Sequence, residues 1–242
     1  MTLQRQKDLI HSTKWDILIV LDACRYDYFK ELNWIKGKLS CVRSPAPHTF
    51  FWFKATWPKK YDVVYFSANP LINSKGIPSP ELGNLNAHKH FRRVIDVWKS
   101  GWDEELGTVP PWEVNKAVES YYDYDSRKVI HYMQPHGPWI GKPRMSMFYE
   151  LEAFLRNGFM ADAYLTHPKP KKEKLEAAYR GNLKLVLRYV DVLINNFPDK
   201  KIIITSDHGE LLGEGGYYLH KFGFPDWLND YLLNVPWLEV EV

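Results

Sequence analysis

The chain has 242 residues, of which 45% are hydrophobic and 25% are charged, and its formal net charge at pH 7 is +3. These values are typical of a globular protein with a substantial core, and the length fits one large α/β domain or at most two small ones. The sequence shows no convincing domain boundary, so we expect a single domain over residues 1–242. The small net charge, with cations spread along the chain, argues against nucleic acid as the main partner and suits a small anionic substrate.

The two cysteines, Cys24 and Cys41, are too few for a disulfide scaffold, and we expect free thiols, with a single bridge as the alternative. The polar start of the chain, Met1 to Trp15, does not resemble a signal peptide. No apolar run approaches the roughly 20 residues that a membrane-spanning helix needs. The sequence therefore predicts a cytoplasmic protein without a membrane segment, and it indicates no oligomeric state.

Apolar runs of strand length alternate with amphipathic segments of helix length. In chain order these patterns predict strands at residues 16–21, 39–42, 63–66, 129–133, 201–205 and 238–240. They predict helices at 26–35, 50–57, 91–98, 111–122, 144–158 and 173–196, with Gly37 ending the first. Residues 69–89 and 168–172 are expected to form surface loops, and both regions are candidate lids. The alternation predicts an α/β fold, with a mostly parallel central sheet and helices on both faces.

Side chains that bind divalent metals lie at the ends of three predicted strands. The candidates are Asp22, the pair His131 and His136, and the pair Asp207 and His208, with His220 one glycine-rich loop further on. Ligands of open parallel sheets bind beyond the carboxyl ends of the strands, where loops bring separate segments together. A carboxylate and an imidazole at the end of a buried strand would be unfavourable there without a cation. The pattern therefore predicts a metalloenzyme.

Three segments resemble the alkaline phosphatase and sulfatase superfamily, and within it the phosphoethanolamine transferases most of all. They are residues 21–27 (LDACRYD), residues 131–138 (HYMQPHGP) and residues 206–220, which contain SDHGE, LGEGG and the final YLH. The helix with Tyr179 and residues 189–191 is similar to the superfamily's helix before its last metal-binding strand. The likeness spans roughly residues 15–236 and implies an alkaline phosphatase-like fold.

The resemblance implies a centre of one or two divalent ions. Asp22, Asp207, His208 and the nucleophile would hold the first ion, and His136 and His220 would hold the second, with room for a further ligand. Mixed carboxylate and imidazole ligands suit zinc or manganese better than calcium.

The superfamily places a Thr, Ser or modified Cys nucleophile at a helix N-terminus soon after its first metal strand. Thr49 is favoured because it opens the aromatic segment 50–57, and Ser44 is the alternative. The residues that follow Cys41 and Ser44 lack the Pro and Arg spacing of formylglycine sulfatases. An unmodified hydroxyl, and hence phosphoryl rather than sulfuryl transfer, is the favoured interpretation.

Two further residues are candidates for binding the substrate. Arg25 is predicted to contact a phosphate, with a salt bridge to Asp27 as the alternative. His48 lies beside Thr49 and is predicted to bind or protonate the substrate, with a turn residue as the alternative.

Other side chains have simpler interpretations. His131 lies within a strand and is expected to be a core histidine or one that supports a ligand. Glu210 is expected to cap a helix after Asp207, and Asp22 has helix capping as an alternative to metal binding.

Together these features predict a divalent-metal-dependent hydrolase, or transferase, of phosphoric esters that acts through a covalent phospho-threonine. One alternative is a sulfatase-like enzyme without formylglycine. Another is a catalytically degenerate member of the superfamily that binds an anion, an alternative suggested by the short interval between Asp22 and Thr49.

Overall fold

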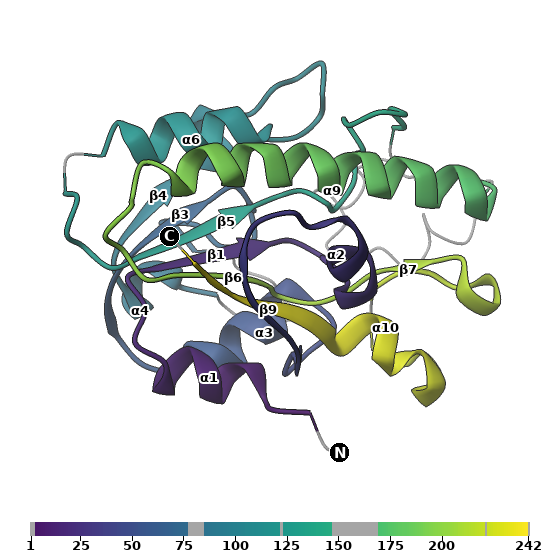
Figure 1. Ribbon diagram of the computed structural model, residues 1–242, viewed down its shortest axis with the longest axis horizontal. Coiled ribbons are helices and arrows are strands. Elements are labelled where there is room, and N and C mark those ends of the chain that lie inside the picture. Colours follow the sequence, from purple (N-terminus) through teal and green to yellow (C-terminus); the bar gives the residue numbers. More distant parts are fainter. Residues whose placement is uncertain (1–2, 77–84, 122, 147–168, 221, 242) are drawn as a thin grey trace.

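Among the described residues, a seven-stranded sheet forms the centre of the protein (Figure 1). The computed structural model describes residues 3–76, 85–121, 123–146, 169–220 and 222–241. The strand order in the sheet is β2-β9-β6-β1-β5-β3-β4. These strands are β1 (Ile17–Leu21), β2 (Gly37–Arg43), β3 (Tyr61–Ser67), β4 (Phe91–Asp96), β5 (Lys128–Tyr132), β6 (Ile202–Ser206) and β9 (Asn234–Val240).

The sheet is parallel except at β9. Strand β1 pairs in parallel with β5 and β6, and β3 pairs in parallel with β4 and β5. Strand β9 is antiparallel to both β2 and β6. The predicted α/β fold with a mostly parallel sheet is confirmed, and β1 lies near its middle.

Helices cover both faces of this sheet (Figure 1). One face packs against α2, α6 and α9, and the other packs against α1, α3 and α4. The helices are α1 (Gln6–Ser12), α2 (Tyr26–Leu32), α3 (Thr49–Thr56), α4 (Ala87–His90), α5 (Val97–Ser100), α6 (Pro111–Glu119), α9 (Lys172–Ile194) and α10 (Asn229–Leu233), with short 3-10 turns at Glu214–Gly216 and Asp226–Leu228.

The position of a residue along a strand decides which core its side chain joins, because successive side chains point to opposite faces. In β1, Ile17 and Ile19 join the core under α9, whereas Leu18 and Val20 join the core under α3. The same alternation divides β3, β5 and β6 between the two cores. It also determines which polar side chains at the strand ends can meet.

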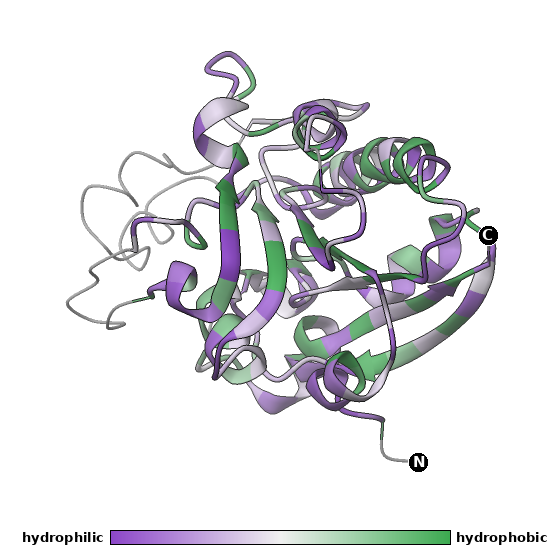
Figure 2. Ribbon diagram, turned by 90° about the vertical axis from the view of Figure 1, so that its left-hand side faces the viewer, coloured by the Kyte–Doolittle hydropathy of each residue, from purple (hydrophilic) through white to green (hydrophobic). Residues whose placement is uncertain are grey.

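The prediction of a helix at residues 91–98 is wrong. Residues 91–96 form the edge strand β4, and only the short helix α5 follows it. Arg92 and Arg93 are both exposed in the middle of this strand and hide its alternation. Figure 2 faces this edge and shows hydrophilic and hydrophobic residues mixed within its two nearest strands. Edge strands commonly carry such charges, which prevent pairing with other chains.

Several predicted boundaries also shift. The first long helix, α2, ends at Leu32, and Gly37 begins β2 instead of ending that helix. The helix predicted at 144–158 falls mostly outside the described residues, and residues 144–146 are not helical. The loop predicted at 69–89 begins with the buried side chains of Asn69 and Asn73. Residues 77–84 of that candidate lid lie outside the described part of the chain.

A small hairpin follows β6 and was not predicted. Its strands are β7 (Leu211–Leu212) and β8 (Tyr218–Leu219), which pair in antiparallel register with Leu211 opposite Leu219. Gly213, Gly215 and Gly216 in its turn have φ angles of 113°, 56° and 81°. Glycine adopts such positive angles without the steric penalty of a Cβ atom, which explains the glycine-rich loop.

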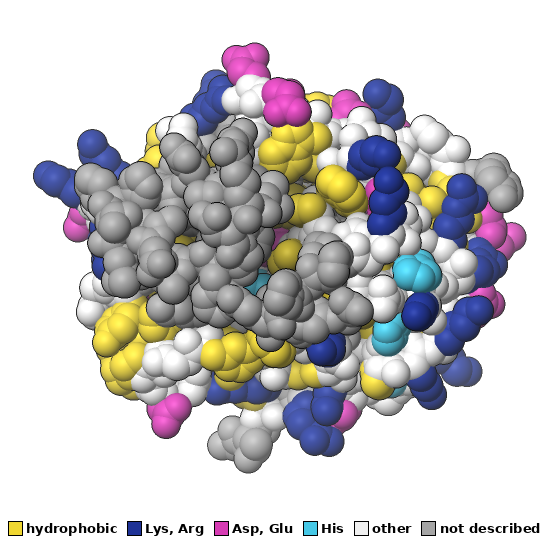
Figure 3. Space-filling model, turned by 180° about the vertical axis from the view of Figure 1, so that it is seen from behind, with side chains coloured by type: hydrophobic (Ala, Val, Ile, Leu, Met, Phe, Trp, Pro, Cys, Tyr) yellow, Lys and Arg dark blue, Asp and Glu magenta, His cyan; other side chains and the backbone are white. Residues whose placement is uncertain are grey.

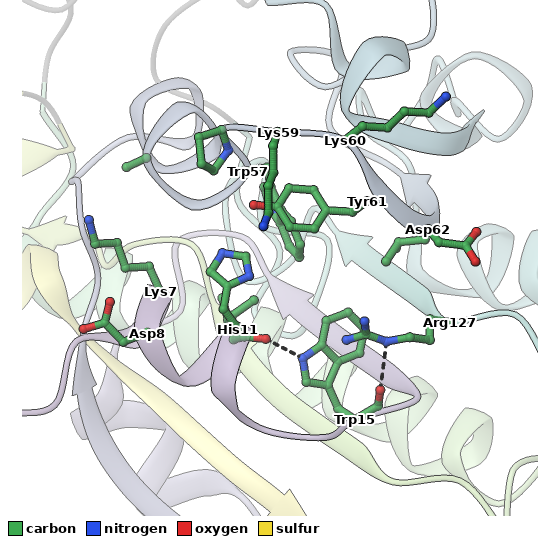
Figure 4. Close-up of a pocket in the computed structure, with 14 residues that line it drawn as sticks. Lys7, Asp8, His11, Trp15, Trp57, Lys59, Lys60, Tyr61, Asp62 and Arg127 are labelled. Carbon is green, nitrogen blue, oxygen red and sulfur yellow. Dashed lines mark hydrogen bonds between the residues drawn. The ribbon is translucent and has the colours of Figure 1, made fainter.

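A cavity of about 760 Å³ lies beside the starts of β1, β3 and β5, at the amino edge of the sheet (Figure 4). His11 stacks on Tyr61 there, and the Arg127 guanidinium lies over the Trp15 ring. The exposed Lys59 and Lys60 lie on its rim. Figure 3 shows Lys and Arg side chains at several margins of the surface seen from behind. The candidate metal ligands lie at the opposite edge of the sheet.

Both cysteines are free thiols, with Cys24 buried and Cys41 partly buried. None of the described helices has the length and apolar character that a membrane span requires. The prediction of one domain over residues 1–242 stays a prediction.

Candidate metal centre

Two carboxylates and one imidazole meet at the carboxyl edge of the sheet. Leu21 pairs with Ser206 and Val20 pairs with His131, so Asp22 and Asp207 leave adjacent strands side by side. Val20, Ile203 and Val129 all belong to the core under α3. Because side chains alternate along a strand, Asp22, Asp207 and His131 lie on that same face of the sheet. His131 Nε2 lies 3.5 Å from Asp22 Oδ2 and 3.8 Å from Asp207 Oδ2. We call Asp22, His131 and Asp207 the strand-end group.

The strand-end group fits a metal ion by the chemistry and spacing of its donor atoms. One donor atom from each of its three residues lies within 4.8 Å of the other two. All three side chains are at most 1% exposed. Asp22 Oδ1 and His131 Nε2 are buried, and neither has a hydrogen-bond partner in the described structure. Buried polar atoms are rarely left unsatisfied, and an ion between them would satisfy both.

Thr49 lies against this group from the opposite side. It is the first residue of α3, and its hydroxyl donates to Asp207 Oδ2 at 2.7 Å. The Thr49 hydroxyl oxygen also lies 3.2 Å from His208 Nε2. Asn69, just after β3, donates to Asp22 Oδ2 at 2.6 Å and reaches the Thr49 oxygen at 3.5 Å. Thr49 is only 2% exposed. Its hydroxyl is oriented by the hydrogen bond to Asp207 and lies among potential metal ligands.

Ser44, the alternative nucleophile, is engaged elsewhere. Its hydroxyl donates to the backbone carbonyl of Asp207 in a very short hydrogen bond and also contacts the carbonyl of Ala46. Those contacts direct it toward the backbone that carries the ligands and not toward the carboxylates. Of the two hydroxyls, only the Thr49 hydroxyl contacts the Asp207 side chain among the described interactions.

A second set of ligands is built by the hairpin that follows β6. Because Leu211 lies opposite Leu219, the next pair in the antiparallel register is Glu210 and His220. The His220 Nδ1 atom lies 3.2 Å from both carboxylate oxygens of Glu210. His136, from the loop after β5, completes a set whose donor atoms lie within 4.8 Å of one another. We call His136, Glu210 and His220 the hairpin group.

His208 lies between the two groups. Its Nε2 lies 3.3 Å from Asp207 Oδ2 and 3.8 Å from Asp22 Oδ1. Its ring centroid lies 4.1 Å from that of His220. The two groups therefore form one continuous cluster of metal-binding side chains.

His208 and His136 each have Nδ1 beside a backbone carbonyl. His208 Nδ1 lies 2.8 Å from the Gly209 carbonyl, and His136 Nδ1 lies 2.6 Å from the Gly137 carbonyl. A carbonyl only accepts, so each Nδ1 carries the proton and each Nε2 keeps its lone pair. This is the tautomer in which metal-bound histidines are commonly held.

Burial and charge shift the protonation equilibria within the cluster. Burial would raise the pKa of Asp22, but the nearby imidazoles of His131, His136 and His208 lower it below its usual range. Burial raises the pKa of Glu210 to about 7. Burial, followed by the charge of His208, lowers the pKa of His220 well below its ordinary value. The metal-free cluster thus favours an ionised Asp22 and a neutral His220, and both states bind cations.

Helix α9 holds the loops that carry these ligands. The Tyr179 hydroxyl donates to the Ala23 carbonyl and accepts from the Arg25 backbone N–H, which fixes the turn after Asp22. One turn further along, Asn182 donates to the His136 carbonyl at 3.0 Å. Its side-chain oxygen also accepts from the backbone N–H groups of residues 140 and 141. The sequence places Asn182 in the core-facing stripe of this helix, and its role there is to order the His136 loop.

Arg25 lies outside both ligand groups. Its guanidinium pairs with Glu214 at 2.6 Å and with Asp27 at 2.5 Å, and it donates to the Glu210 carbonyl at 3.2 Å. It also lies over the ring of Tyr231. The salt bridge with Asp27, the alternative to a phosphate contact, is present. The substrate-binding role of Arg25 stays a prediction, and its contact with Glu210 is through the backbone carbonyl and not the carboxylate.

His48 lies at the mouth of the cluster. It caps the N-terminus of α3, where its Nδ1 accepts from the Phe50 backbone N–H at 3.1 Å. Burial, with the neighbouring His220 and His208, lowers its pKa to about 3. A neutral imidazole whose Nδ1 accepts must carry its proton on Nε2, so His48 can donate one hydrogen bond to an anion.

Sequence reasoning missed two residues of the cluster, Glu210 and Asn69. Glu210 caps no helix, because the β7–β8 hairpin follows it. His131 lies buried beside the two carboxylates, and its expected role as a core histidine or as one that supports a ligand stays a prediction. Asn69 lies two residues beyond β3 and on the same strand face as Tyr65, so the strand-end rule that found Asp22 could have found it. The metal-binding and catalytic roles assigned to the predicted residues stay predictions.

Comparison with known proteins agrees with this fold. No family model matches the chain. The low-salt glycan biosynthesis sulfotransferase Agl7 of Haloferax volcanii is 24% identical over 229 residues, which cover 90% of this chain and 52% of that protein. The chain thus spans about half the length of this curated relative.

Solved structures with a similar fold include two phosphoethanolamine transferases. The integral membrane lipooligosaccharide phosphoethanolamine transferase A of Neisseria meningitidis matches with a TM-score of 0.53 and 15% identity, over 98% of this chain and 49% of that chain. The C-terminal periplasmic domain of phosphoethanolamine transferase EptC from Campylobacter jejuni matches with a TM-score of 0.51 and 18% identity, over 92% and 77%. Periplasmic neighbours give no support to the cytoplasmic location predicted from the sequence.

A sulfatase shares the same architecture. A 2-O GAG sulfatase matches with a TM-score of 0.50 and 12% identity, over 95% of this chain and 65% of that chain. The transferases and the sulfatase together confirm the likeness expected from the sequence motifs. The chain has the fold of the alkaline phosphatase and sulfatase superfamily.

Proposed function

We propose that the protein is a divalent-metal-dependent enzyme that transfers the phosphoryl group of a phosphoric ester through a covalent phospho-threonine at residue 49. The final acceptor is water in a hydrolase, or an alcohol in a transferase. The observation that carries this proposal is the Thr49 hydroxyl, which is buried at the start of α3 and hydrogen-bonded to Asp207 Oδ2 at 2.7 Å.

Thr49 has the surroundings of an activated nucleophile. Its proton already points at the Asp207 carboxylate, and His208 Nε2 lies 3.2 Å from the same oxygen. Asp22, Asp207 and His208 would hold one divalent ion with Thr49, and the hairpin group would hold a second. Zinc or manganese fits this mixture of carboxylates and imidazoles. A bound ion would supply positive charge at the transferring group and lower the pKa of the hydroxyl.

The reaction divides into two displacements at phosphorus. In the first, Thr49 Oγ1 loses its proton toward Asp207 and forms a bond to phosphorus, while the bond to the leaving alcohol breaks and that oxygen takes up a proton. In the second, an oxygen of water or of an acceptor alcohol attacks the same phosphorus. The Oγ1–phosphorus bond then breaks, and Thr49 regains a proton.

An anionic group would be stabilised beside Thr49 by two features of α3. The N-terminus of a helix carries partial positive charge and attracts anions. His48 Nε2 offers a hydrogen bond there, because its Nδ1 is occupied by the Phe50 backbone N–H. The substrate-contacting role predicted for His48 is therefore part of the proposal.

Sulfuryl transfer is the second candidate. The 24% identity to a sulfotransferase favours it, as does the presence of a sulfatase among proteins of the same fold. Threonine oxygen can attack sulfur as well as phosphorus, so the same residues serve either reaction. A third possibility, an anion-binding protein without turnover, would keep the metal ligands but not the reactivity of Thr49.

The proposal is tested by covalent trapping. Metal-free protein is reloaded with zinc or manganese, incubated with aryl phosphate, aryl phosphodiester or aryl sulfate, quenched in acid and analysed by peptide mass spectrometry. We expect the peptide with Thr49 to gain one phosphoryl group, with release of the aryl alcohol.

Two variants provide the controls. Thr49→Ala should abolish both the adduct and turnover, and Thr49→Ser should retain them. Adduct formation with the sulfate ester alone would favour the second candidate. Metal-loaded protein that releases no alcohol from any of the three esters would contradict the enzymatic proposal.

A further inference from the structure

His131 differs from the other histidines of the cluster in what its Nδ1 atom contacts. Its partner is the Tyr65 hydroxyl, at 2.8 Å. A hydroxyl can donate or accept, whereas the carbonyls beside His208 and His136 only accept. The proton of His131 can therefore lie on either nitrogen, and the partner of Nε2 decides which arrangement is favoured.

The environment of His131 Nε2 favours a cation. The atom is buried without a hydrogen-bond partner among the described residues, 3.5 Å from Asp22 Oδ2 and 3.8 Å from Asp207 Oδ2. The lone pair of a neutral imidazole would be repelled by the two carboxylates. If Nε2 carried a proton instead, its N–H would lie too far from either carboxylate for a good hydrogen bond. A metal ion between the three side chains removes both difficulties at once.

Tyr65 is placed to hold this arrangement. It is fully buried in β3, on the same face of the sheet as His131. Its phenol oxygen lies 2.8 Å from His131 Nδ1 and can accept the proton of that nitrogen. Trp52 of α3 lies edge-on to the His131 ring, with centroids 6.1 Å apart, and limits its rotation.

We propose that His131 is a ligand, through Nε2, of the ion held by Asp22 and Asp207, and that Tyr65 is a positioning residue that accepts the Nδ1 proton and so keeps the Nε2 lone pair on the metal. This inference concerns the metal centre of the proposed function and adds a ligand and a supporting residue to it. Supporting residues of this kind typically change metal affinity by about 10–100-fold when mutated.

The test uses metal binding alone, without substrate. Zinc affinity of the full chain is measured by competition with a chelating dye, and cobalt-loaded protein is examined by its visible absorption spectrum, which reports the ligands and their geometry. The variants are His131→Gln and Tyr65→Phe. The matched control is Tyr132→Phe. Tyr132 follows His131 in β5 and is as buried as Tyr65, but its hydroxyl donates to Asn115 on the other face of the sheet.

We expect His131→Gln to weaken zinc binding at the site of Asp22 and Asp207 by more than about 100-fold and to change the cobalt spectrum. Tyr65→Phe should weaken the same site by about 10–100-fold with a smaller spectral change. Tyr132→Phe should match the wild type in both measurements. Tyr65→Phe removes a single oxygen from a buried ring, so it serves as an independent test where the histidine variant does not fold.

Wild-type zinc affinity and an unchanged cobalt spectrum in either folded variant would overturn the assignment of that residue. Because no ester is present, such a result leaves the phosphorylation of Thr49 untouched. Conversely, failure to trap the Thr49 adduct would leave the measured contribution of His131 to metal binding intact.

Discussion

The two ligand groups of the cluster are built in different ways. The strand-end group takes its side chains from the central strands β1, β5 and β6, whose backbones are fixed by pairing on both sides. The hairpin group depends on two short strands and on a loop held by Asn182. The first also has two carboxylates, whereas the second has one. We infer that the strand-end group is the more rigid and the more strongly dependent on a cation.

The largest expected effect comes from Asp207→Asn, which removes one carboxylate of the strand-end group. Wild-type protein should gain about 4 kcal/mol of unfolding free energy when zinc is present at about 1,000 times its dissociation constant. The variant should lose most of this gain together with Thr49 phosphorylation. His220→Gln should lose only the part due to the hairpin group. Thermal unfolding with and without metal measures both, and the exposed Asp199→Asn is the control.

Arg25→Met should lower the free energy of unfolding by breaking a buried ion pair at the hairpin. Arg25 is 3% exposed and pairs with Glu214, which is 7% exposed, in the turn of the hairpin. Removing one partner leaves a buried charge uncompensated, so we expect a loss of about 3–5 kcal/mol. Arg180→Met removes the more exposed pair with Glu31, which solvent screens, and should cost much less than Arg25→Met. Denaturant unfolding compares them, and equal effects would contradict a structural role for Arg25.

The pH dependence of stability should come largely from the hairpin group. Burial raises the pKa of Glu210 from 4.5 to about 7, so metal-free protein holds this proton more tightly than the unfolded chain does. The resulting stabilisation is complete below pH 4.5 and is lost as the pH rises through about 7, with an upper value of about 3 kcal/mol. The lowered pKa values of His220 and His48 act in the opposite direction below pH 6.5, so the Glu210 contribution is measured as the difference in unfolding free energy between chelator-treated wild type and Glu210→Gln. This difference should fall as the pH rises through about 7.

Metal should reverse that trend, because an ion at the hairpin group needs Glu210 ionised. Zinc affinity of this group should therefore increase as the pH rises toward 7. A zinc affinity that is independent of pH between 5 and 7.5, roughly the range in which such a group titrates, would argue against Glu210 as a ligand.

The smallest effect is expected for Ser44→Ala. The Ser44 hydroxyl supports the Asp207 backbone carbonyl, and losing such a hydrogen bond costs about 1 kcal/mol. The variant should still form the Thr49 adduct. An adduct that disappears with Ser44 while Thr49→Ala still forms one would reverse the assignment of the nucleophile.

The sequence predicted the strand-end group better than the hairpin group, for a physical reason. Asp22 and Asp207 follow continuous apolar strands, and the rule that parallel strands end at one edge brings them together. Glu210 and His220 meet only because Leu211 pairs with Leu219 in strands of two residues, which are too short to show an alternation. Strand β4 was missed because exposed arginines interrupt it, and the pairing of His131 with Tyr65 depends on the order of the strands.

The most direct test of the account is the position of bound metal. Crystals of the protein soaked with zinc or manganese, measured at the absorption edge of each metal, should show an anomalous peak in contact with Asp22, His131, Asp207, His208 and the Thr49 hydroxyl. A second peak is expected within the hairpin group. Saturating metal that leaves the strand-end group without a peak, while Asp22 and Asp207 stay as close as they are here, would contradict the central claim.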